Sequence, residues 1–283
     1  ITSSADIIAL LQTYKDEVSQ NVWDIMSVAF GELKKFVETD EKAERKLREF
    51  SRKLAGPSFE KLGWEPVIGE PESDTKLRTL ILGMMIYGEE PAVLAHAKKL
   101  FTGGLEDIDP EVRSLVIGSV VRGSSELELI KDLLQMYRET ASADIRDDIR
   151  AGLSSAKDLA QIDLLLKQFT DNETIRQQDL AHWFVYLIRN RYARADTWQW
   201  MIDNWEWIDT TFSGDKSYDA FPRYAAGVLS TPEQFASYVS FFTPKRTIPA
   251  LTRNIDLGIK EIEARLELLE RDGKAVREKL KEM

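Results

Sequence analysis

Apolar side chains recur every three or four residues along most of the chain, which is the period of amphipathic helices. The first three such segments run from Asp6 to Tyr14, from Asn21 to Val37 and from Asp40 to Leu54. No alternating pattern typical of strands persists, so the sequence predicts an all-α protein. The expected buried stripes are Ile7, Ile8, Leu10, Leu11 and Tyr14 in the first segment, Trp23, Met26, Phe30, Leu33, Phe36 and Val37 in the second, and Leu47, Phe50 and Leu54 in the third.

A glycine and two prolines mark a break after these segments. Gly63 follows a helical run, and glycine readily takes the backbone conformation that closes a helix. Pro66 and Pro71 then prevent a helix over the polar connector between Glu65 and Ser73. Asp74 is expected to open the next amphipathic helix, because aspartate is a favoured N-cap residue.

From residue 74 onward the sequence repeats itself around an arginine that recurs at intervals of 35, 33 and 30 residues. A period of this size, made of two helices, is typical of solenoids, and HEAT-like pairs describe it best. We expect each arginine to pair with an acid in the first turn of its helix or to reach a carbonyl group of the adjacent unit. A small residue five positions later would let a neighbouring helix approach. The arginines are Arg78, Arg113, Arg146 and Arg176, the acids are Asp74, Asp109, Asp144 and Glu173, and the small residues are Gly83, Gly118, Ala151 and Ala181.

The second helix of each unit is expected to end on an aromatic residue. After the repeat, Thr231-Pro232-Glu233 reads as a helix start, with a capping residue followed by proline. The second helices are expected over 90–101, 124–137, 157–169 and 197–212. The closing helices are expected over 218–229, 231–242 and 249 to about 280, with Gly273 as a candidate interruption and Leu251, Ile255, Ile259, Ile262, Leu266 and Leu269 as the last apolar stripe.

Composition narrows the functional classes. The 283 residues suffice for a large core without staples, and the chain has no cysteine for disulfides or cysteine-based zinc sites. The formal charge of −10 opposes a general phosphate-binding surface, so we expect no nucleic acid partner. No apolar run is long enough to span a bilayer, so no membrane partner is expected. The chain begins at Ile1 with neither an initiator methionine nor a signal-peptide pattern, so we expect a piece of a longer, cytoplasmic protein.

Candidate catalytic groups are few. The two histidines, His96 and His182, are 86 residues apart, and neither belongs to the two-histidine, one-glutamate pattern of a zinc peptidase helix. We therefore expect the two histidines to be packed in the fold or to lie on its surface. We expect no catalytic residue and no metal-binding residue in this chain. The tryptophans of the fourth unit could form a ligand cage, but at helical spacing packing is favoured.

Several motifs, in order, resemble one family. They are G-P-x-x-x-x-L-G-W at Gly56–Trp64, then Gly69-Glu70, then S-D-x-x-L-R at Ser73–Arg78, and later I-R-x-Q-D at Ile175–Asp179 followed by W-x-W-x-x-x-N-W at Trp198–Trp205. This layout resembles the C-terminal helical domain of zinc aminopeptidases of the aminopeptidase N and puromycin-sensitive type. The resemblance covers the chain from about Ser19 to its end.

The resemblance implies a bowl-shaped α-α superhelix of HEAT-like pairs. It would be a single domain over 1–283, with N-terminal helices over 1–64, repeated pairs over 74–212 and closing helices over 218–283. Such a domain is not catalytic by itself. It covers the active site of a catalytic domain in the same polypeptide, encloses the peptide chamber and contacts the peptide substrate. Zinc is expected in that missing catalytic domain and no cofactor in this part.

One site residue is implied by the resemblance. The family carries R-x-I/V-Q near the start of its last helix, with the arginine facing the substrate cavity, and Arg253 matches that position while Asp256 replaces the glutamine. A guanidinium can bind a peptide carboxylate or carbonyl through its planar fork. The alternative for Arg253 is an exposed salt bridge to Asp256 or to the preceding turn.

A second function class stays open on the repeat alone. A protein-binding HEAT-like adaptor would show the same periodicity and would use its groove for a partner peptide. An H-E-x-x-H motif several hundred residues upstream would distinguish the enzyme from the adaptor.

Overall fold

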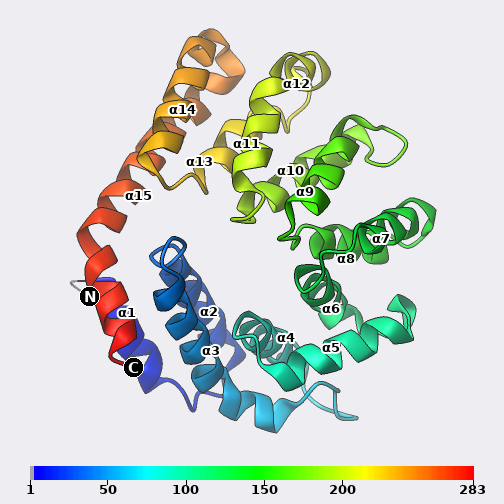
Figure 1. The fold of residues 1–283 in the computed structure, drawn as a ribbon, viewed down its shortest axis with the longest axis vertical. Coiled ribbons are helices and arrows are strands. Elements are labelled where there is room, and N and C mark those ends of the chain that lie inside the picture. The colour runs from blue at the N-terminus through cyan, green and yellow to red at the C-terminus, as the bar shows by residue number, and fades with distance from the viewer. Residues whose placement is uncertain (1–2) are drawn as a thin grey trace. The chain divides into compact units, whose positions relative to one another are not determined.

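The structure is a computed structural model that describes residues 3–283, and over these residues it contains helices and no strand. This confirms the predicted all-α fold of helix pairs. The helices form two compact units, which are described separately below. The first comprises residues 1–120 together with 268–283, and the second comprises residues 121–267. Figure 1 shows the order of the helices along the chain.

The first unit is built mainly on three helices that pack on one another. Helix α4 contacts both α2 and α3, and the Ser51 hydroxyl of α3 donates to the Met84 carbonyl of α4 over 2.8 Å. At Gly88 a Cβ would lie only 2.6 Å from Arg52 Cγ, so this position needs glycine. The helices that begin in this unit are α1 (Asp6–Thr13), α2 (Gln20–Lys34), α3 (Glu41–Leu62), α4 (Glu72–Tyr87), α5 (Pro91–Gly103), the 3₁₀ turn η1 (Leu105–Asp107) and α6 (Pro110–Arg122), whose last two residues belong to the second unit.

Both ends of the chain contribute to the first unit. The Ser4 backbone N–H and hydroxyl donate to the Asp272 carboxylate over 2.8 and 2.6 Å. Arg271 and these two donors hold the pKa of Asp272 well below its usual range. Farther along, Arg277 donates to the Phe36 carbonyl over 3.2 Å. The last turns of the chain are therefore anchored against its first helices.

The second unit is a run of shorter helices with an aromatic-rich core. Helix α10 contacts α11 and α13, and α9 contacts α7 and α11. Gly258 lets α15 approach closely here, because a Cβ at 258 would overlap the Tyr238 hydroxyl and lie 2.9 Å from the Ala226 Cβ. The helices are α7 (Leu127–Glu139), α8 (Ala143–Leu153), α9 (Leu159–Lys167), η2 (Gln168–Thr170), η3 (Gln177–Asp179), α10 (Leu180–Arg189), α11 (Arg194–Asp203), α12 (Trp205–Phe212), α13 (Ala220–Ala226), α14 (Pro232–Phe242), η4 (Thr243–Thr247) and α15 (Pro249–Lys281), which continues into the first unit.

Side-chain caps begin several of the helices, among them α6, where Asp109 accepts from the Glu111 N–H over 2.9 Å. Thr231 accepts from the Gln234 N–H at the start of α14, as its sequence predicts. Asp40 and Asp158 each accept two backbone N–H groups at the starts of α3 and α9, and Ser142 accepts one at the start of α8. Gly63 ends α3 with a positive φ of 59°, as predicted, but its ψ of −158° differs from that of the left-handed helical conformation.

The expected helix boundaries are wrong at three places. Helix α4 begins at Glu72, so Asp74 lies inside its first turn and is not its cap. The helix expected over 197–212 is two helices that break at Asn204, whose side-chain amide donates to the Trp200 carbonyl over 2.8 Å. Gly273 does not interrupt α15, which runs to Lys281.

The expected stripes are buried completely in α2 and α3 but only partly in α1 and α15. In α15, Leu251, Ile255 and Ile262 are buried, whereas Ile259, Leu266 and Leu269 are half-buried. The stripes of α2 and α3 are confirmed in full, and Ile8 and Leu11 of α1 are buried. Leu10 and Tyr14 are 45% and 43% exposed, so the stripe of α1 is narrower than predicted. The error follows from helix length, because an eight-residue helix has only two turns to cover.

The repeated arginines bind carbonyl groups at the end of the preceding helix. Arg78 Nε donates to Leu62 O over 3.2 Å, and Arg146 Nε donates to Tyr137 O over 3.3 Å. Arg113 Nε donates likewise to Leu105 O over 2.8 Å. Helix ends leave carbonyls without partners inside the helix, so Arg78 and Arg146 cap the C-terminal ends of α3 and α7. Arg113 holds the single turn η1 at both ends, since it also donates to the Ile108 carbonyl over 3.0 Å.

Of the two partners predicted for the repeated arginines, the carbonyl group is the one observed at Arg78, Arg113 and Arg146. The acid that pairs with Arg78 is Glu70 of the connector, through two bonds of 2.5 and 2.6 Å, and not Asp74. Two other expectations about this repeat are wrong. Arg176 is exposed and precedes a 3₁₀ turn, so the fourth unit has no arginine that caps the preceding helix. Gly83 is not required by a close approach either, since a Cβ there would meet Leu115 at an ordinary 3.9 Å.

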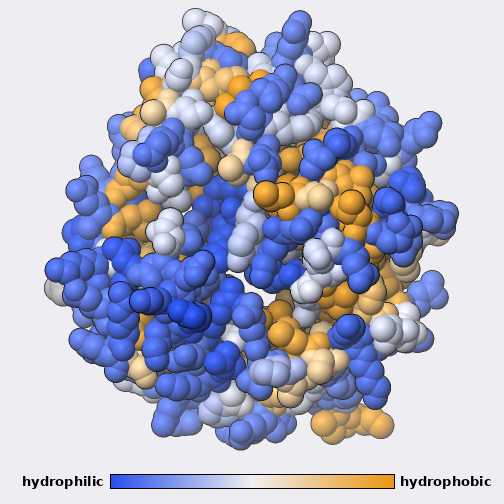
Figure 2. All heavy atoms as spheres, viewed as in Figure 1, coloured by the Kyte–Doolittle hydropathy of each residue, from blue (hydrophilic) through white to orange (hydrophobic). Residues whose placement is uncertain are grey.

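Polar side chains dominate the face seen in Figure 2, with apolar residues between them. Among residues 3–283, no helix has the length and apolar character needed to cross a membrane.

Candidate functional site

Arg253 lies in the second turn of α15 with its side chain exposed. The turns around it are fixed by other residues: Asn254 Nδ2 donates to Asp219 O over 2.7 Å, and the Thr252 hydroxyl donates to Arg246 O over 2.9 Å. Within the described part of the chain, the guanidinium of Arg253 makes no hydrogen bond or ion pair. It is thus available to a ligand, although its role stays a prediction.

The alternative expected for Arg253 is wrong. Asp256 pairs with Arg246 over 2.6 Å instead. The two members of this pair are each about half exposed, so the pair itself contributes little to stability.

The two histidines lie in different units and do not form a metal site. His96 of α5 stacks on Trp64, with ring centroids 4.8 Å apart and planes 22° apart, and its Nε2 is buried without a partner. His182 lies exposed on α10. No group of three or more histidine, aspartate or glutamate side chains in residues 3–283 could hold a metal ion. The residues present here therefore do not fit zinc.

Most of the tryptophans of the fourth unit pack in the core, as their helical spacing predicts. Trp183 Nε1 donates to the Tyr137 hydroxyl over 3.1 Å, and Trp198 stacks on Tyr238 with centroids 5.9 Å apart. Trp205 meets Phe241 and Phe242 edge to face, with both centroid distances 5.5 Å. Trp200 differs, because one part of its indole lines an open groove while its edge meets Phe169.

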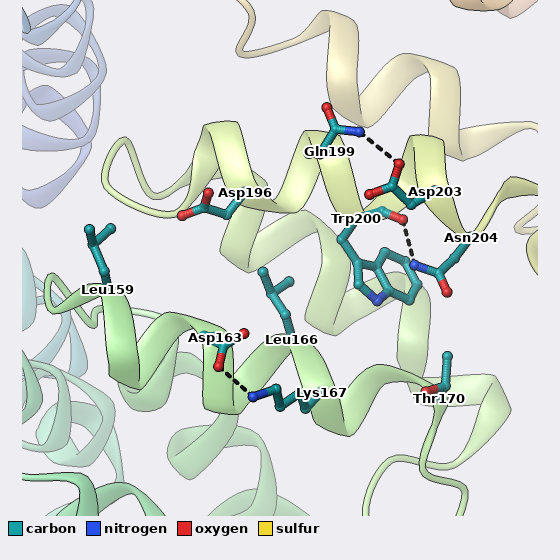
Figure 3. A pocket seen from close by; sticks show the side chains of 10 residues that line it. All are labelled: Leu159, Asp163, Leu166, Lys167, Thr170, Asp196, Gln199, Trp200, Asp203 and Asn204. Atoms are coloured by element: carbon teal, nitrogen blue, oxygen red, sulfur yellow. Dashed lines mark hydrogen bonds and ion pairs between the residues drawn. The ribbon is translucent and has the colours of Figure 1, made fainter.

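This groove lies between α9 and α11 and has a volume of about 620 Å³. Figure 3 shows its two walls, with Asp196 and Asp203 on α11 and Leu159 and Leu166 on α9. Asp158 caps the start of α9, and the Asn204 amide bonds the last turn of α11. The ten residues of the groove are Leu159, Asp163, Leu166, Lys167, Thr170, Asp196, Gln199, Trp200, Asp203 and Asn204.

The groove is acidic, with a partly apolar floor. Asp163 pairs with Lys167 over 2.6 Å, and Gln199 donates to one Asp203 oxygen over 2.7 Å. Asp196 and Asp203 are seven residues apart, two helical turns, and so share a face of α11 with Trp200 between them. Carboxylates beside an indole can hold a cationic side chain. The lining contains no histidine and no cysteine.

The clearest perturbed carboxylate lies outside this groove. The hydrogen bonds from Arg78, together with the Val67 N–H and the Thr75 hydroxyl, lower the pKa of Glu70 to about 2. Arg78 is buried and Glu70 nearly so, hence the pair is structural: it fastens the connector to α4.

Sequence reasoning missed three features. Glu70 belongs to the quoted motif, but the repeat predicts Asp74, and not Glu70, as the acid that pairs with Arg78. Arg265 carried no repeat signal, yet it donates to Ala226 O and Leu229 O over 2.6 and 2.7 Å and so caps α13. The groove has no signal in the sequence except Trp200, because its walls come from two helices that begin at Leu159 and Arg194.

Comparison with known proteins identifies the family. Residues 1–264 match the profile described as ERAP1-like C-terminal domain. Aminopeptidase N of Lactobacillus helveticus is 31% identical over 277 residues, which are 97% of this chain and 33% of the relative. Aminopeptidase N of Lactococcus lactis subsp. lactis (strain IL1403) is 29% identical over 286 residues, 100% of this chain and 34% of the relative. Glutamyl aminopeptidase of Bitis rhinoceros is 24% identical over 241 residues, 84% of this chain and 25% of the relative.

In all three cases the alignment covers most of this chain but only a small part of the relative. Nearly all of this chain aligns, but it spans about a third of the length of the aminopeptidase N relatives. The aligned region is their C-terminal third. The chain therefore belongs to the ERAP1-like C-terminal domain family and corresponds to the C-terminal part of aminopeptidase N-like enzymes.

Proposed function

We propose that this chain is the non-catalytic C-terminal domain of a zinc-dependent aminopeptidase. It covers the active site of an upstream catalytic domain in the same polypeptide and encloses the chamber in which peptides are cut. The observation that carries this proposal is the match of residues 1–264 to the family, joined to relatives named aminopeptidase N that are three times as long. Zinc would be held upstream, because the described residues here offer no ligand set.

Arg253 is the proposed substrate contact. Its guanidinium is exposed and has no partner among the described residues, which suits a fork that waits for a peptide carboxylate or carbonyl. A cytoplasmic location is proposed as well, and the cysteine-free sequence supports it.

The full reading frame tests the proposal. We expect an H-E-x-x-H motif upstream, one zinc in the parent polypeptide and chelator-sensitive release of N-terminal residues from peptides. The isolated chain should bind no stoichiometric zinc and turn over no aminoacyl substrate. A tightly held zinc in the isolated chain, or chelator-sensitive turnover by it, would contradict the proposal.

The adaptor is the second candidate, and the groove between α9 and α11 is the observation in its favour. It predicts a reading frame without a zinc motif and a partner peptide bound in that groove. A basic peptide suits the two carboxylates, Asp196 and Asp203. The same reading frame therefore separates the two functions.

A further inference from the structure

The most exposed aliphatic side chains gather in one part of the sequence. Single exposed apolar residues are common on proteins, whereas neighbouring ones that form a contiguous patch mark a surface that a partner covers. Among residues 3–283, six large apolar side chains are at least two-thirds exposed, and five of the six fall within the first 68 residues. They are Val18 (68%), Ile25 (71%), Val28 (68%), Val67 (70%), Ile68 (103%) and Leu159 (68%).

Two of them form an outer face on α2. Ile25 and Val28 are three residues apart, so they are neighbours on the helix surface. At 3.6 residues per turn, they point opposite to the buried stripe that contains Trp23 and Phe30. Helix α2 therefore has two apolar faces, of which this chain covers one.

Several polar groups around this outer face already have partners. Gln20 donates to the Asp24 carboxylate, and the Ser27 hydroxyl donates to Asp24 O over 2.8 Å. Farther along the helix, Glu32 pairs with Lys35 over 2.7 Å. Asn21 is exposed one turn before Ile25 and belongs to the polar rim. An apolar partner could therefore cover Ile25 and Val28 while these polar groups stay paired or at the solvent-exposed rim.

The relatives indicate what lies on this face. Their aligned region is the C-terminal third, so two thirds of each aminopeptidase N relative precede the part that this chain matches. Helices α1 and α2 are the first elements along the chain, hence the nearest in sequence to that preceding part. We propose that the outer face of α2, centred on Ile25 and Val28, docks on an apolar patch of the upstream part of the same polypeptide. This inference rests on the proposed function, which supplies the parent polypeptide.

Side-chain footprinting tests the docking. Hydroxyl radicals should label Ile25 and Val28 readily in the isolated chain and severalfold less in the full-length protein. Leu159 is equally exposed but lies in the second unit, so its labelling should stay the same in both. Equal labelling of Ile25 and Val28 in the two proteins would overturn the proposal, and so would equal protection of Leu159. Loss of labelling in the isolated chain as its concentration rises would show that a second copy covers the face, and would overturn it too.

Variants add a second readout. Ile25→Lys and Val28→Lys should leave the melting temperature of the isolated chain unchanged, because both positions are solvent-exposed and lysine is a good helix former. In the full-length protein each should expose the junction before the domain to faster proteolysis, severalfold over the parent. Met136→Lys, at an exposed position of α7, is the matched control and should have no effect. Unchanged proteolysis of both α2 variants would refute the docking.

The two proposals fail in different ways. A reading frame without a zinc motif would end the aminopeptidase assignment, whatever the footprint shows. A zinc aminopeptidase in which Ile25 and Val28 stay fully reactive would leave that assignment intact and refute only the α2 interface.

Discussion

At the residue scale, one device recurs in this chain: an arginine caps the carbonyl end of the element before its own helix. Arg78, Arg113 and Arg146 do so in the repeat. Arg265 of α15 caps an earlier helix in a similar way, because it binds the carbonyls at the end of α13. Guanidinium suits the task, because it has five donors in a fixed fork and stays charged when it is buried. The first three arginines therefore recur at the interval at which one helix or turn ends and the next helix begins.

Replacing the buried arginines should destabilise the fold. Arg113→Ala removes the side-chain donor that binds the carbonyls of Leu105 and Ile108. Arg78→Ala removes the donor to the Leu62 carbonyl and the cation that pairs with Glu70. We expect each variant to lose about 1–3 kcal/mol of unfolding free energy in urea titrations. Arg176→Ala removes an exposed arginine of the same repeat and is the control, expected within about 0.5 kcal/mol of the parent. Equal stability of all three variants would show that the capping contacts contribute nothing.

The Glu70–Arg78 pair should make stability depend on pH. The pKa of Glu70 falls from its ordinary 4.5 to about 2 on folding, so its contribution is complete above pH 4.5 and is lost as the pH drops towards 2. Glu70→Gln should therefore be less stable than the parent at neutral pH, and the gap should narrow at about pH 3. Glu65→Gln changes an exposed acid of the same connector and should show no gap at either pH. Because Asp272 is common to all the proteins, its own titration cancels in the comparison. A constant gap across the range would contradict the assignment.

At the element scale, the sequence predicts helices well where an apolar stripe is long and fails where local polar contacts decide. The stripe of α2 is buried as expected, and so is that of α3. By contrast, the break at Asn204 follows from one side-chain amide bonded to the Trp200 carbonyl, a contact that periodicity cannot show. The interruption predicted at Gly273 does not occur, because long-range bonds hold the turns around it. One of them runs from the Ser4 backbone N–H to the Asp272 carboxylate.

The candidate site was less predictable than the fold. Arg253 could be named from a motif, because the motif lies within one helix turn. The groove could not, because the stretches that form it, around Leu159 and around Asp196, have no common sequence signal. Neighbours across two helices depend on packing, which the pattern of one helix does not contain.

Two glycines test the packing between elements. Gly258→Ala should destabilise the second unit by about 1–3 kcal/mol, because the new methyl would overlap the Tyr238 hydroxyl. Gly31→Ala is the matched control: nothing lies within 4 Å of the added methyl, and alanine is the better helix former, so stability should rise by about 0.5–1 kcal/mol. Thermal unfolding of the two variants measures both the expected loss of stability and the expected gain. A Gly258→Ala protein as stable as the parent would mean that α15 shifts freely over α13 and α14.

At the scale of the whole molecule, the chain has helices, caps and a core of its own. The described residues offer an exposed guanidinium on α15, an acidic groove and exposed apolar side chains on α2. Under the proposed function, these surfaces serve binding, and the catalytic groups belong to the preceding part of the polypeptide. The aminopeptidase N relatives are about three times as long as this chain, which supports that division.

The role of Arg253 is decided in the full-length enzyme. Arg253→Ala should weaken peptide substrates, and the loss of one charge-assisted bond of this kind costs about 1.5–3 kcal/mol, which would appear in kcat/KM. The melting temperature should not change, because no described residue bonds to this guanidinium.

A matched substitution separates substrate contact from charge. Arg246→Ala also removes one cation near the start of α15, but its guanidinium is held by Asp256 and is not free for a peptide. It should leave peptide kinetics close to those of the parent, whereas Arg253→Ala should not. If Arg253 contacts the far end of the peptide, short aminoacyl substrates that cannot reach it should be cut normally by the Arg253→Ala enzyme, and only longer peptides should suffer. Unchanged kinetics for long peptides, or an equal loss for short and long ones, would show that Arg253 is not the substrate contact.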